Sequence, residues 1–200
     1  MKIGIMGGTF NPIHIGHLVC AEEALNNYSL EQVIFMPTGR HPWSKPAAAE
    51  IGAEFRFLMT EIATSDNPRF VVSRYELDRP QPSYTVDTIR HFREEMPEAE
   101  LFFITGADAV LEILEWKDPE ELLSMATLIA ATRPGYSLDR LSSEVGGFLK
   151  QNRVKIMEIP SIGISSSLIR ERVAKGMSIR YLVPEGVLGF IVKERLYRQA

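Results

Sequence analysis

The sequence MKIGIMGGTFNPIHIGH, residues 1–17, decides the fold of this 200-residue chain. The apolar run Lys2–Met6 predicts a buried strand, and Gly7 and Gly8 end it. The helical spacing of apolar residues at 17–27 predicts that a helix follows. Glycine lets the backbone come close to a ligand, and the free N–H groups at a helix start attract anions. This strand–turn–helix unit therefore predicts a phosphate site.

Two of the four histidines of the chain, His14 and His17, fall at the entrance to this helix. Residues three apart share one face of a helix, so the two imidazoles can converge on one group. The turn fits neither the Walker pattern, which requires a lysine, nor the G-x-G-x-x-G pattern of dinucleotide-binding proteins. Two alternatives stay open from these residues alone. The alternatives to a phosphate site are a structural pair of histidines and a metal pair, and a metal pair needs a further ligand.

Composition indicates an ordinary globular protein in one compact domain. Apolar residues make up 45% and charged residues 24% of the chain. The formal net charge of −4 argues against a general nucleic-acid-binding protein, and no apolar run is long enough to span a membrane. One cysteine leaves no internal disulfide, which is typical of a reducing compartment, so we expect a cytoplasmic protein.

Strand-like runs alternate with helical patterns along the chain. The strands are expected at 2–6, 32–36, 70–77, 101–105, 127–131 and 154–159, and the helices at 17–27, 54–64, 85–95, 109–114, 119–124, 138–149, 167–175 and 186–197. This alternation predicts an α/β fold: a doubly wound, Rossmann-like parallel sheet with helices on both faces, in a single domain over residues 1–200. In such a sheet, ligands bind beyond the carboxyl ends of the strands, where the winding reverses between the first and fourth strands.

Two further segments reach this expected edge. The fourth strand ends at Gly106 and Asp108, which the fold places beside the first glycine turn. Asp108 suits ribose hydroxyls or a magnesium-bound water, and it suits equally the N-cap of a helix that starts at Ala109. Arg133 follows the fifth strand, where it can reach a phosphate or lie solvated in a loop.

A serine cluster precedes the helix expected at 167–175. Ser165, Ser166 and Ser167 predict the start of that helix. Arg170 then lies in roughly the first turn, where the helix dipole opposes a positive charge. A bound anion would make that position favourable, so the cluster predicts a site for a triphosphate.

The stretch GGTFNPIHIGH, residues 7–17, resembles the signature of the nucleotidyltransferases that carry an H-x-G-H motif. The order of the later motifs makes the whole chain resemble the bacterial nicotinate-nucleotide adenylyltransferases. That resemblance implies adenylyl transfer from ATP, with Mg²⁺, to nicotinate mononucleotide, giving nicotinate adenine dinucleotide and pyrophosphate in NAD biosynthesis. It implies ATP and nicotinate mononucleotide as partners, with no nucleic acid and no membrane, and it leaves a homo-oligomer open.

The resemblance also implies roles for individual residues. For catalysis it implies His14, His17 and Arg170. For ATP binding it implies Gly7, Gly8, Thr9, Phe10, His14, His17, Gly106, Asp108, Arg133, Ser165, Ser166, Ser167 and Arg170. The chain has Ser167 where the family usually has threonine. It implies no dedicated protein ligands for a metal, since Mg²⁺ comes with ATP.

The nicotinate nucleotide is expected on other segments. The sequence SYTVDT at 83–88 matches the family's stretch for the nicotinate half, and N–H groups at a helix start suit a carboxylate. From the residues alone, Ser83 or Thr85 caps that helix, and Trp116 anchors the core as readily as it stacks on a pyridine ring. The residues that the resemblance implies there are Thr9, Lys45, Tyr84, Thr85 and Trp116.

The loop at 42–45 departs from the family pattern. It reads Pro-Trp-Ser-Lys where the family usually has Pro-Pro-His-Lys, so Lys45 remains and the role of the family histidine does not carry over. This change leaves room for a sibling transferase with another phosphorylated acceptor, such as phosphopantetheine, or for a non-catalytic nucleotide-binding module. For the transferase we expect direct in-line attack without a covalent intermediate, because the attacking phosphate is already an anion.

Overall fold

A six-stranded parallel sheet runs through the protein. The computed structural model describes residues 1–40, 51–135, 138–160 and 162–198, except for the side chains of 138–142 and 144. The strand order is β3-β2-β1-β4-β5-β6. The strands are β1 (Lys2–Gly8), β2 (Gln32–Pro37), β3 (Phe70–Val72), β4 (Glu100–Gly106), β5 (Ala126–Thr132) and β6 (Val154–Glu158). The predicted doubly wound fold is confirmed, with the reversal between the first and fourth strands.

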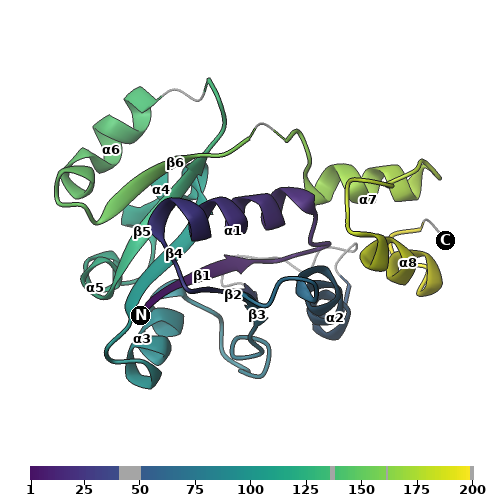
Figure 1. Cartoon of the computed structure of the whole chain (residues 1–200), viewed down its shortest axis with the longest axis horizontal. Coiled ribbons are helices and arrows are strands. Elements are labelled where there is room, and N and C mark those ends of the chain that lie inside the picture. Colours follow the sequence, from purple (N-terminus) through teal and green to yellow (C-terminus); the bar gives the residue numbers. More distant parts are fainter. Residues whose placement is uncertain (41–50, 136–137, 161, 199–200) are drawn as a thin grey trace.

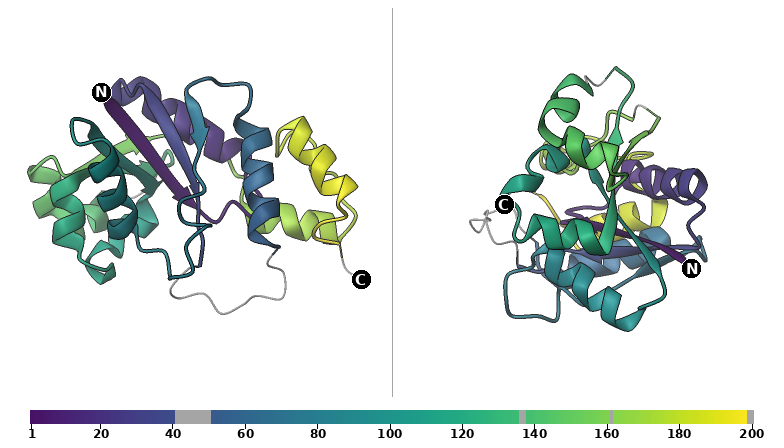
Figure 2. Two further views of the ribbon diagram at one scale, coloured as in Figure 1. Left: turned by 90° about the horizontal axis from the view of Figure 1, so that it is seen from below. Right: turned by 90° about the vertical axis from the view of Figure 1, so that its left-hand side faces the viewer.

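Helices cover both faces of the sheet (Figures 1 and 2). One face carries α1 (Ile15–Tyr28), α2 (Ala53–Thr64), α7 (Ser166–Ala174) and α8 (Glu185–Lys193). The other face carries α3 (Thr85–Glu95), α4 (Ala107–Leu111), the 3₁₀ helix η1 (Ile113–Glu115), α5 (Pro119–Met125) and α6 (Leu138–Lys150). In the described part of the chain, no helix combines the length and apolar character that crossing a membrane requires.

Side chains of each strand alternate between two buried clusters. In β4, Phe102 and Ile104 face the side of α1, whereas Leu101 and Phe103 face the side of α3. Ile5 in β1 lies opposite both Ile34 of β2 and Phe103 of β4. Full burial of one such side chain stabilises the fold by about 1.5–3 kcal/mol. The central strands are therefore a firm platform for the loops at their carboxyl ends.

Two predicted elements are shorter in the structure. The strand expected at 70–77 ends at Val72, because β3 is an edge strand that pairs with only three residues of β2 before the chain turns. The helix expected at 186–197 ends at Lys193, and Arg195 and Tyr197 follow it with positive φ angles of 54° and 61°. Apolar spacing alone does not mark either of these ends.

Two predicted helix starts also differ. The helix expected from Ala109 begins at Ala107, so Asp108 lies in its first turn and Gly106 is the N-cap. The N-cap of α3 is Tyr84, and its side chain makes no capping hydrogen bond, so neither Ser83 nor Thr85 caps this helix. The hydroxyl of Ser83 is buried instead.

Candidate active site

A cavity of about 550 Å³ lies at the carboxyl ends of β1, β4 and β5. Four segments line it: the start of α1, the residues after β4, the end of β5 and the connection from β6 to α7. The structure therefore brings together residues that the sequence separates by up to about 150 positions. The predicted site residues that line the cavity are His14, His17, Gly106, Asp108, Arg133, Ser165 and Ser166.

His14 and His17 form a stacked pair at the start of α1. Their ring centroids lie 3.7 Å apart with an interplanar angle of 21°. The backbone N–H of His14, the N-cap, donates a hydrogen bond of 3.2 Å to Nδ1 of His17. Because Nδ1 of His17 accepts, the proton of the neutral ring is on Nε2, which becomes a hydrogen-bond donor.

Both imidazoles are neutral at pH 7 in the ligand-free protein. Burial and, to a smaller extent, the positive charge of Arg133 together lower the pKa of His14 from its ordinary value of 6.5 to about 4. Burial lowers the pKa of His17 to about 3, with a smaller effect from His14. Nδ1 of His14 is buried without a hydrogen-bond partner among the described residues. The pair is thus suited to binding through hydrogen bonds rather than through full charges.

The glycine turn has a different structural reason from the one the sequence indicated. A Cβ atom at Gly8 would lie 2.8 Å from the ring of Phe10, and one at Gly7 would lie 3.0 Å from the ring of Phe103. Phe10 is only 2% exposed, and its ring meets the ring of His17 edge-on at 5.1 Å. Glycine is therefore required here for packing on phenylalanine rings. The side chain of Phe10 is in the core, so only its backbone is available to a nucleotide.

The start of α7 is fastened to the turn that precedes the histidines. Of the three serines expected to start this helix, Ser165 is the N-cap, and its Oγ accepts a hydrogen bond of 3.1 Å from the backbone N–H of Leu168. Ser166 donates from Oγ to the carbonyl oxygen of Pro12 at 2.8 Å. These contacts set the serine cluster and the histidine pair in one rigid frame.

Arg170 is the fifth residue of α7, just beyond the expected first turn. Its guanidinium donates to the carbonyl oxygen of Asn11 at 2.8 Å and to Oγ of Ser167 at 3.2 Å. Protein acceptors therefore offset part of the unfavourable interaction with the helix dipole. Neither Ser167 nor Arg170 lines the cavity, and Gly7, Gly8 and Thr9 do not line it either.

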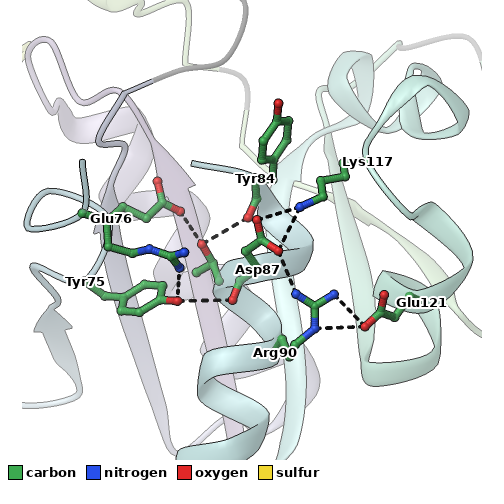
Figure 3. A network of polar contacts seen from close by, with 9 residues as sticks. Tyr75, Glu76, Tyr84, Asp87, Arg90, Lys117 and Glu121 are labelled. Carbon is green, nitrogen blue, oxygen red and sulfur yellow. Dashed lines mark hydrogen bonds and ion pairs between the residues drawn. The ribbon is translucent and has the colours of Figure 1, made fainter. Parts of the chain in front are cut away.

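The segments expected to bind the nicotinate half lie together at the start of α3. Lys117 donates to both carboxylate oxygens of Asp87, at 3.2 and 3.1 Å, and its ammonium lies 4.8 Å from the ring centroid of Tyr84. Figure 3 shows this network and the ring of Tyr84 projecting beyond the helix start. Trp116, adjacent to Lys117, is half-buried, and its ring meets that of Phe103 edge-on at 6.1 Å.

These acceptor-side residues stand apart from the cavity walls. Tyr84, Thr85 and Trp116 pack on the α3 side of the sheet, and none of them lines the cavity. Lys45 lies outside the described residues, together with the altered loop around it. Thr9 is exposed at the turn between β1 and α1.

The donor set of the cavity fits a magnesium ion that arrives with a nucleotide. Mg²⁺ usually keeps several waters and takes one or two carboxylates together with phosphate oxygens. Asp108 supplies an exposed carboxylate to the cavity wall. Among the described residues, no group of three or more His, Cys, Asp or Glu side chains is arranged to hold a metal ion alone.

The sequence reasoning missed part of the cavity wall. Ile159, Ile162 and Ile164 form an apolar side of the cavity on the connection from β6 to α7. Such a surface suits a flat aromatic base. The signal was present in the three isoleucines of IPSIGIS, a stretch with no helical or strand pattern of its own. The other lining residues that were missed are Gly16, Cys20, Ala107, Ala131 and Thr132.

This combination of a doubly wound sheet, a cavity at its switch point and a paired-histidine helix start defines a class of nucleotidyltransferases. The chain belongs to the cytidylyltransferase-like family, whose model matches residues 5–172. It is 53% identical to the probable nicotinate-nucleotide adenylyltransferase of Leifsonia xyli subsp. xyli, over 98% of this chain and 94% of the relative. It is 51% identical to the corresponding protein of Streptomyces coelicolor, over 96% of this chain and 99% of the relative. Within the class, this chain is a member of the nicotinate-nucleotide adenylyltransferase family.

A solved structure has the same fold. It is the nicotinic acid mononucleotide adenylyltransferase of Plasmodium falciparum complexed with NaAD, with a TM-score of 0.78 and 20% sequence identity. The match covers 98% of this chain and 97% of that one. The family that the motif resemblance implied is confirmed.

Proposed function

We propose that this protein transfers the adenylyl group of ATP to nicotinate mononucleotide, forming nicotinate adenine dinucleotide and pyrophosphate. The proposal rests on one observation: the histidine pair and the start of α7 line the same cavity. Ser166 connects them, because it donates a hydrogen bond to the carbonyl oxygen of Pro12, two residues before His14. The names of the half-identical relatives support the choice of substrates. We take residues 1–200 as one nucleotidyltransferase domain.

The reaction we propose is a direct in-line displacement. An oxygen of the acceptor's 5′-phosphate forms a bond to the α-phosphorus of ATP. The bond from that phosphorus to the α,β-bridging oxygen breaks, and pyrophosphate leaves with the electron pair. The neutral rings of His14 and His17 donate hydrogen bonds to the phosphate oxygens on which negative charge grows. No proton has to leave either ring.

The triphosphate binds between the two helix starts. The hydroxyls of Ser165 and Ser167, the backbone N–H of Ser166 with the other free N–H groups of α7, and the guanidinium of Arg170 hold the β- and γ-phosphates. Arg133 adds positive charge at the rim, and Gly106 leaves room beside Asp108 for the ribose. Mg²⁺ bound to ATP would neutralise phosphate charge, and Asp108 would hold it through a water molecule. Gly7, Gly8, Thr9 and Phe10 contribute through their backbone.

The acceptor binds on the α3 side. The N–H groups at the start of α3, around Tyr84 and Thr85, receive the nicotinate carboxylate. Trp116 stacks on the pyridine ring, and Thr9 and Lys45 contact the acceptor phosphate. This arrangement favours the acid over the amide, because nicotinamide has no negative charge to offer the helix start.

The direct test compares acceptors in one assay of pyrophosphate release. Nicotinate mononucleotide, nicotinamide mononucleotide and phosphopantetheine are each supplied with ATP and Mg²⁺. We expect the acid mononucleotide to give the highest kcat/KM. Faster release with phosphopantetheine would assign the protein to the sibling transferase, and no release with any acceptor would leave only a nucleotide-binding module.

A further inference from the structure

Tyr197 connects the C-terminal segment to the turn that precedes the histidine pair. Its hydroxyl donates a hydrogen bond of 2.7 Å to Oδ1 of Asn11, 186 residues earlier in the chain. Tyr197 follows α8 and lies beyond residues 5–172, which the family model matches. Figure 1 shows α8, which Tyr197 follows, on the side of the molecule toward which β1 points. The contact therefore joins the end of the chain to the edge of the sheet where the cavity lies.

Donors from α2 and α7 hold the backbone of the same turn. Arg56, which is 3% exposed, donates to the carbonyl oxygen of Thr9 at 2.8 Å. Arg170 and Ser166 donate to the carbonyl oxygens of Asn11 and Pro12, each at 2.8 Å. These hydrogen bonds fix the directions of the carbonyl groups of Thr9, Asn11 and Pro12.

The fixed carbonyls determine where the amides of the turn point. In a planar trans peptide, the N–H of the next residue points away from the preceding C=O. With the carbonyls of Thr9 and Pro12 held by Arg56 and Ser166, the N–H groups of Phe10 and Ile13 point the opposite way. The turn leads directly into His14, so its orientation also sets the start of α1.

Tyr197 holds the side chain of Asn11, whereas the donors from α2 and α7 hold carbonyl oxygens of the backbone. We infer that Tyr197 is a positioning residue for adenylyl transfer: through Asn11 it holds the turn at 9–12 in the orientation that the histidine pair and the phosphates require. This inference rests on the proposed function. Burial raises the pKa of the Tyr197 hydroxyl, although Arg170 and Arg56 oppose that effect, so the hydroxyl keeps its proton over the working pH range.

The chain offers a matched control. Tyr28 also donates its hydroxyl to one protein acceptor, the carbonyl oxygen of Ile156 at 3.4 Å, and it packs on the same face of the sheet. Tyr28 does not line the cavity. Tyr197→Phe and Tyr28→Phe therefore remove the same atom, once at the turn and once away from it.

The experiment measures steady-state pyrophosphate release and unfolding temperature for the wild type and both variants. We expect Tyr197→Phe to lower kcat about tenfold, because small misplacements of reacting groups have large effects on rate. We expect KM for each substrate to stay within about twofold and the unfolding temperature to match that of Tyr28→Phe. The double variant with Asn11→Ala and Tyr197→Phe should have nearly the same kcat as Asn11→Ala alone, because each substitution removes the same hydrogen bond.

A second measurement separates this inference from the proposed function. Hydrogen exchange of the amides of Phe10, Asn11 and Ile13 in the free protein needs no catalysis, and we expect it to be at least about tenfold faster in Tyr197→Phe than in Tyr28→Phe. The inference would be overturned if Tyr197→Phe changed neither kcat nor the exchange rates. It would also be overturned if Tyr197→Phe and Tyr28→Phe lowered kcat equally. If the wild type released no pyrophosphate, the proposed function would fail, and the exchange rates would still decide whether Tyr197 holds the turn.

Discussion

The histidines are assigned the role of neutral hydrogen-bond donors in the proposed reaction, because burial disfavours their charged forms. Their pKa values of about 4 and about 3 lie far below the ordinary value of 6.5. A neutral donor contributes little to binding of the ground-state triphosphate and more as charge accumulates in the transition state. The proposed role of the pair therefore predicts an effect on kcat rather than on nucleotide binding, and it is testable one residue at a time.

His17→Ala should lower kcat about 100- to 1,000-fold, the range observed when one donor to a developing oxyanion is removed. KM for ATP should change by less than about threefold, measured by pyrophosphate release. His91→Ala is the matched control, because His91 lies in α3, stacks on Tyr75 and does not line the cavity. Turnover of His17→Ala near that of the wild type would remove His17 from the mechanism.

The pH profile distinguishes neutral donors from a general acid. If His14 and His17 have lost their protons by pH 5, kcat/KM should be flat within about threefold from pH 7 to pH 9. An imidazolium acting as an acid would instead make kcat/KM fall tenfold for each pH unit above its pKa. A steady fall across this interval contradicts the neutral pair.

At the scale of elements, a buried carboxylate joins two segments on the acceptor side. Glu76 follows β3 and is 7% exposed. It accepts hydrogen bonds from Oγ1 of Thr88 in α3, at 2.7 Å, and from the N–H of Gly39 after β2, at 3.4 Å. The start of α3, where the nicotinate carboxylate is expected, is thus tied to the loop that comes after β2. Arg79 also faces this carboxylate.

Glu76→Gln should change how stability depends on pH. Burial raises the pKa of Glu76 above its ordinary value, against the hydrogen bond from Thr88. Between the ordinary and the raised pKa, the folded state binds more protons than the unfolded state, so Glu76 makes stability fall as pH rises. The glutamine variant lacks this effect. Urea unfolding from pH 4 to pH 7 should therefore show the variant gaining stability relative to the wild type as pH rises, and a constant difference would refute the assignment.

Gly39 is packed too closely to accept a side chain. A Cβ there would lie 2.0 Å from the carbonyl oxygen of Glu76, a backbone atom that cannot turn aside. Gly39→Ala should lower the free energy of unfolding by about 1–3 kcal/mol and raise KM for nicotinate mononucleotide more than KM for ATP. Gly52→Ala is the control for steric conflict, since nothing lies within 4 Å of a Cβ placed there. Gly52 is the N-cap of α2, so urea unfolding should show a loss of no more than about 1 kcal/mol.

At the scale of the whole molecule, the features that depend on topology could be predicted from the sequence. Apolar spacing located the strands, and the rule that parallel strands end at one edge placed Gly106, Asp108 and Arg133 at one cavity with the start of α1. Arg56 and Tyr197 escaped prediction for a physical reason. Their acceptors lie 47 and 186 residues away, and hydrogen bonds of that kind leave no periodic mark in the sequence.

The same topology makes the nucleotide a stabiliser of the whole molecule, because the cavity joins α1, β4, β5 and α7. ATP with Mg²⁺ at 100 times its Kd should raise the free energy of unfolding by about 2.7 kcal/mol, or the unfolding temperature by roughly 5–10 °C. Since the histidines act on the transition state, His17→Ala should keep this shift relative to its own nucleotide-free form. Arg170→Ala should lose most of it, because its guanidinium is assigned to the phosphates of the ground state, and chelating Mg²⁺ should reduce it in all forms. A shift lost in His17→Ala and kept in Arg170→Ala would reverse the two assignments, with α1 binding the nucleotide and α7 serving the reaction.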